Sequence, residues 1–128
     1  MASQTSSFYK YSSATQALAI WGGWSYYVNS KVSVTAGIKS GIAQGVASFF
    51  LTLIVVFLVT KVFNYFKLSL LKFSAPTLLV VSMLLTFLVT LHTAVGTPEI
   101  LKTIIPPLTM AILFCAFTTY KLSNEKAY

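Results

Sequence analysis

The chain has 128 residues, of which 56% are hydrophobic and only 9% are charged. This composition is typical of a membrane protein and favours one compact helical bundle. All nine basic residues are lysines, the acids are Glu99 and Glu125, and the formal net charge is +7. Because most lysines flank apolar segments, we expect them to contact lipid head groups, and we expect no nucleic-acid partner.

The N-terminal segment 1–13 is rich in serine and threonine and is expected to be flexible. Residues 14–29 carry apolar side chains at helical spacing, but two glycines interrupt them. Four aromatic side chains in this segment suit the head-group region and are predicted to be interfacial anchors: Trp21, Trp24, Tyr26 and Tyr27. We therefore expect an interfacial or re-entrant helix over 14–29, with a fourth membrane span as the alternative.

Residues 37–60 are predicted to form the first secure transmembrane helix. This segment would rise roughly 36 Å as a helix, enough to cross a hydrocarbon core of about 30 Å. Gly37, Gly41 and Gly45 recur every four residues, and Ser48 continues their face. Small residues on one face let another helix backbone approach closely, so these four positions are predicted to be helix-packing residues.

The segment 61–73 is predicted to be a basic amphipathic loop, because its lysines alternate with leucines and aromatic residues. With the polar tail 121–128 it carries most of the positive charge that flanks the spans. The lysines on this side are Lys61, Lys67, Lys72, Lys121 and Lys126, against Lys31, Lys39 and Lys102 on the other. We therefore place the loop and the C-terminus in the cytoplasm of a multi-pass protein, which by its size and simplicity is assigned to a bacterial inner membrane.

Residues 74–95 are predicted to be the second secure span, with Ser74 as its cap and Pro76 in its first turn. Small polar residues recur along one face of this helix, and we expect this face to pack against the glycine face of 37–60. The small polar residues assigned to packing are Ser82, Thr86 and Thr90.

The last part of the chain is predicted to contain a break. Gly96 should end the second span, and Thr97 should cap a short outer-side helix over 98–104. The pair Pro106 and Pro107 removes two amide donors and is expected to stop or kink that helix. A third span over 107–120 should follow. The fold class is therefore all-α and polytopic, with three secure transmembrane helices.

His92, Glu99 and Lys102 are the one cluster of ionisable side chains expected to meet, yet each has a sufficient structural explanation. No catalytic residue is assigned, and replacement of His92 or Glu99 by alanine is expected to be tolerated. The single Cys115 is interpreted as a small apolar filler. One His, one Cys and two Glu cannot supply the ligands of a typical zinc site, so neither a metal nor a cofactor is expected.

Two functions remain open at this point. The first is a non-enzymatic subunit, scaffold or assembly factor that acts through glycine-mediated helix packing, as a homo-oligomer or with a larger membrane-protein partner. The second is a small oligomeric transporter, channel or lipid carrier, in which Gln44, His92, Glu99 and Lys102 would line a path or contact a ligand. A holin-like pore is a variant of the second, because the chain resembles holins in size and number of spans. Under both hypotheses, membrane lipids are expected partners of the protein.

Overall fold

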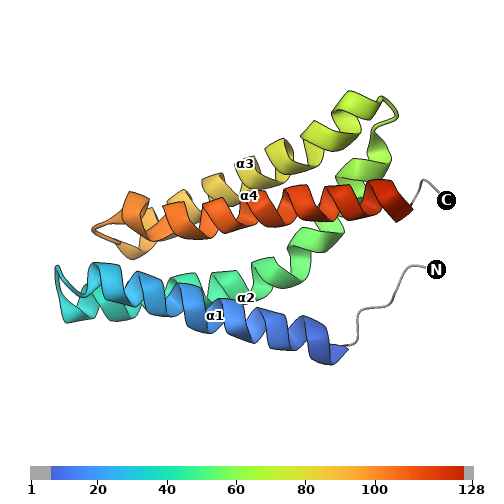
Figure 1. Cartoon of the computed structure of the whole chain (residues 1–128). Coiled ribbons are helices and arrows are strands. Elements are labelled where there is room, and N and C mark those ends of the chain that lie inside the picture. Colours follow the sequence, from blue (N-terminus) through green and yellow to red (C-terminus); the bar gives the residue numbers. More distant parts are fainter. Residues whose placement is uncertain (1–6, 126–128) are drawn as a thin grey trace.

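The computed structural model describes residues 7–125, except for the side chain of Tyr9. The regular structure of this part is entirely helical and consists of α1 (Ser7–Asn29), α2 (Val34–Tyr65), α3 (Ser69–Val95) and α4 (Ile100–Glu125). Figure 1 shows the helices running alternately in opposite directions, with α1 beside α2 and α3 beside α4. The connections 30–33 and 96–99 lie at one end of the bundle, called here the two-loop end. The predicted all-α fold is confirmed.

Three helices, α2, α3 and α4, are long and apolar enough to span a membrane. Many of their large hydrophobic side chains lie on the outside of the bundle, where a bilayer would contact them. Examples are Ile42, Phe57, Leu78 and Leu113. An apolar exterior of this kind is expected when the solvent is lipid. The chain is therefore a polytopic helical membrane protein.

The glycine face of α2 packs against α1. A Cβ atom added to Gly41 would lie 3.1 Å from the carbonyl oxygen of Gly22, and one added to Gly45 would lie 3.2 Å from that of Leu18. The two backbones are thus too close for side chains between them, as small-residue packing allows. Residues nearer the end of α1 contact residues nearer the start of α2, so the two helices are antiparallel.

The prediction that the small polar face of α3 packs on this glycine face is wrong. The short connection 30–33 folds α1 directly back onto α2, and a Cβ atom at Gly37 would lie 2.7 Å from Ser30 Cβ. The glycine face is therefore already covered. The three α3 residues are exposed instead, and each donates to a carbonyl of its own helix: Ser82 to Leu78, Thr86 to Ser82 and Thr90 to Thr86.

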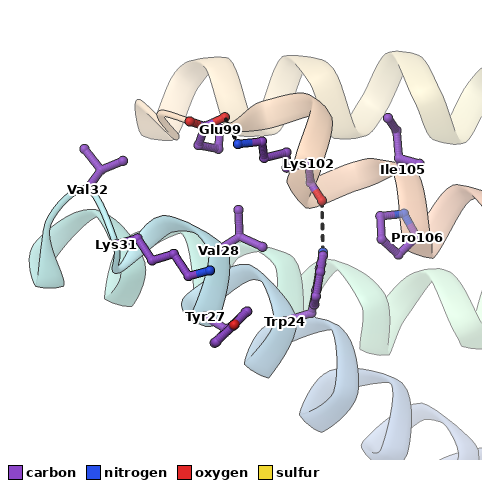
Figure 2. Close-up of a pocket in the computed structure, with 9 residues that line it drawn as sticks. All are labelled: Trp24, Tyr27, Val28, Lys31, Val32, Glu99, Lys102, Ile105 and Pro106. Atoms are coloured by element: carbon purple, nitrogen blue, oxygen red, sulfur yellow. Dashed lines mark hydrogen bonds and ion pairs between the residues drawn. The ribbon is translucent and has the colours of Figure 1, made fainter.

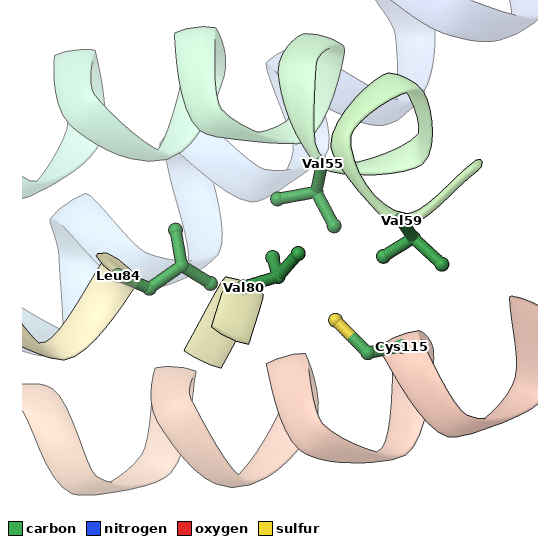
Figure 3. Close-up of a cluster of buried hydrophobic side chains, with 5 residues drawn as sticks. All are labelled: Val55, Val59, Val80, Leu84 and Cys115. Carbon is green, nitrogen blue, oxygen red and sulfur yellow. The ribbon is translucent and has the colours of Figure 1, made fainter. Parts of the chain in front are cut away.

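In its second half, α2 bends away from α1 toward α3 and α4 (Figure 1). A buried apolar cluster joins the three helices there, with Val55 and Val59 from α2, Val80 and Leu84 from α3, and Cys115 from α4 (Figure 3). The burial of Cys115 among these side chains agrees with its interpretation as an apolar filler. Because α2 leaves α1 at this point, the first half of α1 and the second half of α4 diverge.

The predicted break before 107–120 is wrong, because α4 is one continuous helix through Pro106 and Pro107. The two prolines withhold the amide donors that would bond the carbonyls of Lys102 and Thr103. Prolines are tolerated inside transmembrane helices when neighbouring groups satisfy the freed carbonyls. There is accordingly no separate outer-side helix over 98–104.

Several predicted boundaries also shift. The segment 61–73 is largely helical, because α2 runs to Tyr65 and α3 begins at Ser69, so the connection is only 66–68. Ser74 is inside α3, where its hydroxyl donates to the Leu70 carbonyl 2.7 Å away, so it does not cap the helix. Pro76 is likewise interior.

The two ends of the chain are more helical than expected. Residues 7–13 belong to α1 and residues 121–125 to α4, whereas 1–6 and 126–128 lie outside the described part. The predicted end of α3 is confirmed: Gly96 adopts a left-handed conformation with φ of 80°, which glycine takes without steric cost.

Candidate functional site

A chain of buried polar side chains lies near the two-loop end and is called here the His92 network. His92 Nε2 lies 2.7 Å from Gln44 Oε1, and His92 Nδ1 lies 2.7 Å from Thr97 Oγ1. The chain continues from Thr97 to Ser40 Oγ at 2.9 Å and from Gln44 Nε2 to Ser48 Oγ at 3.0 Å. All five side chains are buried. The network therefore ties α2 to α3 and to the connection 96–99.

The donors and acceptors of the His92 network run in one direction. Because Gln44 Nε2 donates to Ser48, Gln44 Oε1 is the acceptor and receives the N–H of His92 Nε2. In a neutral imidazole, Nδ1 would then accept from the Thr97 hydroxyl, and the Thr97 oxygen would accept from Ser40. Both ring nitrogens are engaged, so His92 presents neither a free base nor a free metal ligand.

A second polar cluster joins α1 to the start of α4. The Asn29 amide donates to the Ser25 carbonyl and to Thr103 Oγ1, both at 2.8 Å, and its Oδ1 accepts from the Glu99 backbone N–H at 3.0 Å. The Thr103 hydroxyl donates to the Glu99 carbonyl at 2.7 Å. Asn29 thus supplies the acceptor at the start of α4 that was predicted to come from Thr97, whose hydroxyl belongs to the His92 network.

The indole of Trp24 compensates for one of the prolines in α4. Trp24 Nε1 donates to the carbonyl oxygen of Lys102 at 3.0 Å. This is the carbonyl that would accept the amide N–H of residue 106 in a regular helix, and Pro106 has none. The hydrogen bond therefore satisfies a helix carbonyl and also fixes α1 to α4.

Farther from the two-loop end than this contact, α1 and α4 enclose a groove of about 430 Å³, called here the lateral groove. Parts of α2 and α3 also line it, and the lining is mostly apolar. Representative lining residues are Ala17, Trp21, Leu51, Leu88, Met110 and Phe114. Gln44 and Ser48 reach the same wall, so the His92 network borders the groove. A cavity of this size is within the range of about 300–1,000 Å³ that is usual for small-molecule sites.

A second cavity of about 440 Å³ lies at the two-loop end and is called here the charged mouth. Figure 2 shows Trp24, Tyr27 and Lys31 on one side of it and Glu99 and Lys102 on the other. Lys31 Nζ lies 4.3 Å from the centroid of the Tyr27 ring, and Lys102 Nζ lies 3.7 Å from Glu99 Oε2. The mouth thus holds two ammonium groups and one carboxylate.

The charged mouth and the lateral groove, together called here the crevice, follow one another between α1 and α4 and share no lining residue. Lining residues recur every three or four positions on one continuous stripe of each helix, as expected for a single face. They are Ala17, Trp21, Trp24 and Val28 on α1, followed by Lys31 in the connection 30–33, and Lys102, Pro106, Met110 and Phe114 on α4. The hydrogen bond from Trp24 to Lys102 crosses the crevice where the two parts meet.

The predicted ionisable cluster is divided in two. Glu99 and Lys102 form an ion pair at the charged mouth, while His92 is buried in its own network. No hydrogen bond or ion pair joins His92 to either residue within the described part of the chain. Over the same residues, no group of three His, Cys, Asp or Glu side chains is placed to hold a metal ion.

The remaining predicted residues also divide by position. Gln44 and His92, which the sequence could not pair, are hydrogen-bonded to each other. Among the aromatic residues predicted to be anchors, Tyr26 and Tyr27 are exposed near the two-loop end, whereas Trp21 lines the lateral groove and Trp24 binds Lys102.

Several residues of the site were not identified from the sequence. Ser40 precedes Gln44 and Ser48 by four and eight positions, and this spacing was a readable signal for one polar seam on α2. Asn29 and Thr103 carried no such signal, because 74 positions separate them.

Comparison of the chain with protein-family models, with curated proteins and with solved structures gave no match. The geometry of the crevice is therefore the basis for assigning a function.

Proposed function

We propose that this chain is a non-enzymatic membrane protein that binds a lipid, whose acyl chain occupies the lateral groove. The observation that carries the proposal is the groove itself, which is mostly apolar and lies between helices of a membrane protein. Apolar surface between membrane-spanning helices, within the hydrocarbon core of the bilayer, is in contact with lipid acyl chains. Of the two functions open from the sequence, this supports the lipid-carrier class.

The size of the lateral groove favours an acyl chain over another helix. A transmembrane helix about 10 Å across and 30 Å long occupies roughly 2,400 Å³, several times the volume of about 430 Å³ found here. A partner helix could place only its side chains in the groove. A single extended chain, in contrast, is narrow enough to lie along it.

The proposal is tested by photolabelling. The protein is reconstituted in phospholipid vesicles that contain a trace of a phospholipid with a diazirine in its acyl chain, and labelled peptides are identified by mass spectrometry. We expect labelling of the groove residues Met110 and Phe114 to exceed that of the outward-facing Phe57. Ala17→Trp, which fills the groove, should lower groove labelling several-fold, while Ala19→Trp, on another face of α1, should not. Equal labelling of groove and outward-facing residues in the unmodified chain would contradict the proposal.

We also propose that α1 crosses the membrane as a fourth helix. It contains 23 residues, about 34 Å of helix, and runs antiparallel along the membrane-spanning α2. A crossing α1 places its start on the same side as the connection 66–68 and the end of α4. Lys10 then joins the larger group of lysines, which by the positive-inside rule puts this side in the cytoplasm of a bacterial inner membrane.

A second candidate function, a subunit or assembly factor, is favoured by the exposed face of α3. Ser82, Thr86 and Thr90 are small, and their hydroxyl groups donate to their own helix, so another backbone could approach without leaving a donor unpaired. Glycine-mediated packing on a partner has no such support, because α1 covers the glycine face. Thr86→Cys in a Cys115→Ala background should form disulfide-linked dimers in membranes if a second copy packs on this face, whereas Leu85→Cys should not.

A further inference from the structure

We propose that the lipid is a phospholipid whose phosphodiester is held at the charged mouth by Lys31 and Lys102. This inference rests on the proposed function, since the acyl chain would continue from the mouth into the lateral groove. It adds the chemical class of the head group, which the groove alone does not determine.

The position of the charged mouth suits a head group. The mouth lies between the connections 30–33 and 96–99, where α2 begins, α3 ends and α4 begins. Because these are the ends of membrane-spanning helices, the mouth lies at the depth of the membrane interface. Trp24 and Tyr27 line it, and both residue types favour that depth.

The charge of the mouth suits a single phosphodiester anion. Two lysines and one glutamate line the cavity, which leaves an excess of one positive charge. Lys102 is paired with Glu99 through a contact of 3.7 Å and has a side chain that is 70% exposed, so it remains free to bind a second anion. The Lys31 ammonium lies over the Tyr27 ring. Among the described residues no carboxylate forms an ion pair with this ammonium, so its three N–H donors are available to a ligand.

The length of the crevice matches one lipid. Ala17 lies twelve positions before the end of α1 at Asn29, which corresponds to about 18 Å along the helix, and Lys31 follows in the connection 30–33. One leaflet, with its head groups, is half of a bilayer of about 40–45 Å, or roughly 20–22 Å thick. A phospholipid with its phosphate at Lys31 would therefore extend its acyl chain to the level of Ala17.

The experiment compares lipids that share the same acyl chains. The full-length protein is purified in mild detergent, each lipid is added, and bound lipid is counted by native mass spectrometry. We expect dioleoyl phosphatidylglycerol to be retained roughly tenfold better than dioleoylglycerol, which has no phosphate. The double variant Lys31→Gln/Lys102→Gln should abolish this preference, whereas Lys39→Gln, a lysine of the same end that does not line the mouth, should preserve it. Glu99→Gln should increase retention, because it removes the competing carboxylate.

The outcomes separate this inference from the proposed function. Equal retention of phosphatidylglycerol and dioleoylglycerol, together with normal photolabelling of Met110 and Phe114, would overturn the head-group assignment and leave the groove proposal intact. Loss of groove labelling with every lipid would overturn both. Glycerol 3-phosphate, which has the phosphate but no acyl chain, should not compete with phosphatidylglycerol. Full competition by it would replace the lipid with a soluble phosphate ester as the ligand.

Discussion

His92 Nε2 and Gln44 Oε1 lie 2.7 Å apart inside the bundle and join α3 to α2. Neither residue has an alternative partner in lipid, so the pair holds α2 and α3 in a defined register near the two-loop end. The same glutamine borders the lateral groove. The wall of the groove therefore depends on a hydrogen bond that lies behind it.

Gln44→Leu should destabilise the protein by about 1–2 kcal/mol, because it leaves the N–H of His92 buried without an acceptor. His92→Ala should lower the stability at least as much, since it breaks two hydrogen bonds. The expectation from sequence was that this substitution is tolerated, and the structure replaces it. Thermal unfolding in lipid nanodiscs measures both effects. Thr86→Val, which removes an exposed hydroxyl that bonds only its own helix, is the control. Wild-type stability of Gln44→Leu would show that the pair contributes little.

Gly41→Leu should displace α1 from α2. Any side chain at this position meets the Gly22 carbonyl and the Tyr26 side chain within 3.1 Å, and overpacking of this kind costs about 1–3 kcal/mol. Gly23→Leu is the matched control, because an added Cβ there meets no heavy atom within 4 Å beyond its chain neighbours and the nearby backbone of its own helix. Limited proteolysis of α1 in detergent should be accelerated only in the Gly41 variant. Equal protection of both variants would argue against close contact of the backbones.

The bond from Trp24 to Lys102 should contribute more to stability while residue 106 is proline. Trp24→Phe removes the donor and should cost about 1 kcal/mol of stability. In a Pro106→Ala background, the new amide N–H can satisfy the Lys102 carbonyl, so the same substitution should cost less. Unfolding of the two single variants and the double variant measures this coupling. Strict additivity would show that the indole does not compensate for the proline.

Ser25→Ala should stabilise the protein or leave it unchanged. Ser25 Oγ is fully buried and has no hydrogen-bond partner among the described residues, so removing it relieves a desolvated polar group. Asn29→Ala is the contrasting variant, because it removes three hydrogen bonds from the same end of α1. A loss of stability in Ser25→Ala comparable to that of Asn29→Ala would mean that the hydroxyl has an unseen partner.

The proposed topology predicts which cysteines react from outside the cell. In a Cys115→Ala background, Val32→Cys should react with a membrane-impermeant maleimide on intact cells, and Lys67→Cys should react only after lysis. Phe8→Cys, at the exposed start of α1, should behave like Lys67→Cys if α1 crosses the membrane. Labelling of Phe8→Cys on intact cells would place α1 at the outer interface instead.

The membrane fold could be predicted because its signals are local. The apolar segments containing Phe57, Leu78 and Leu113 indicate membrane spans directly, since a crossing helix needs about 20 predominantly apolar residues in a row. The end of α3 was also readable, because Gly96 takes a backbone conformation that other residues avoid. The spacing of the α2 glycines indicated a face that another backbone can approach, and in the structure α1 lies against it.

The identity of the partner for each surface was decided by tertiary structure. The sequence showed that Gly41 could meet a backbone, but α1 and the small polar face of α3 both had suitable small residues. In the structure, the short connection 30–33 folds α1 back onto the glycine face of α2. Likewise, Pro106 predicts a helix break whenever the freed carbonyl has no donor. In the folded chain Trp24, 82 positions before Pro106, supplies a donor to that carbonyl, a contact that no local sequence signal links to the proline.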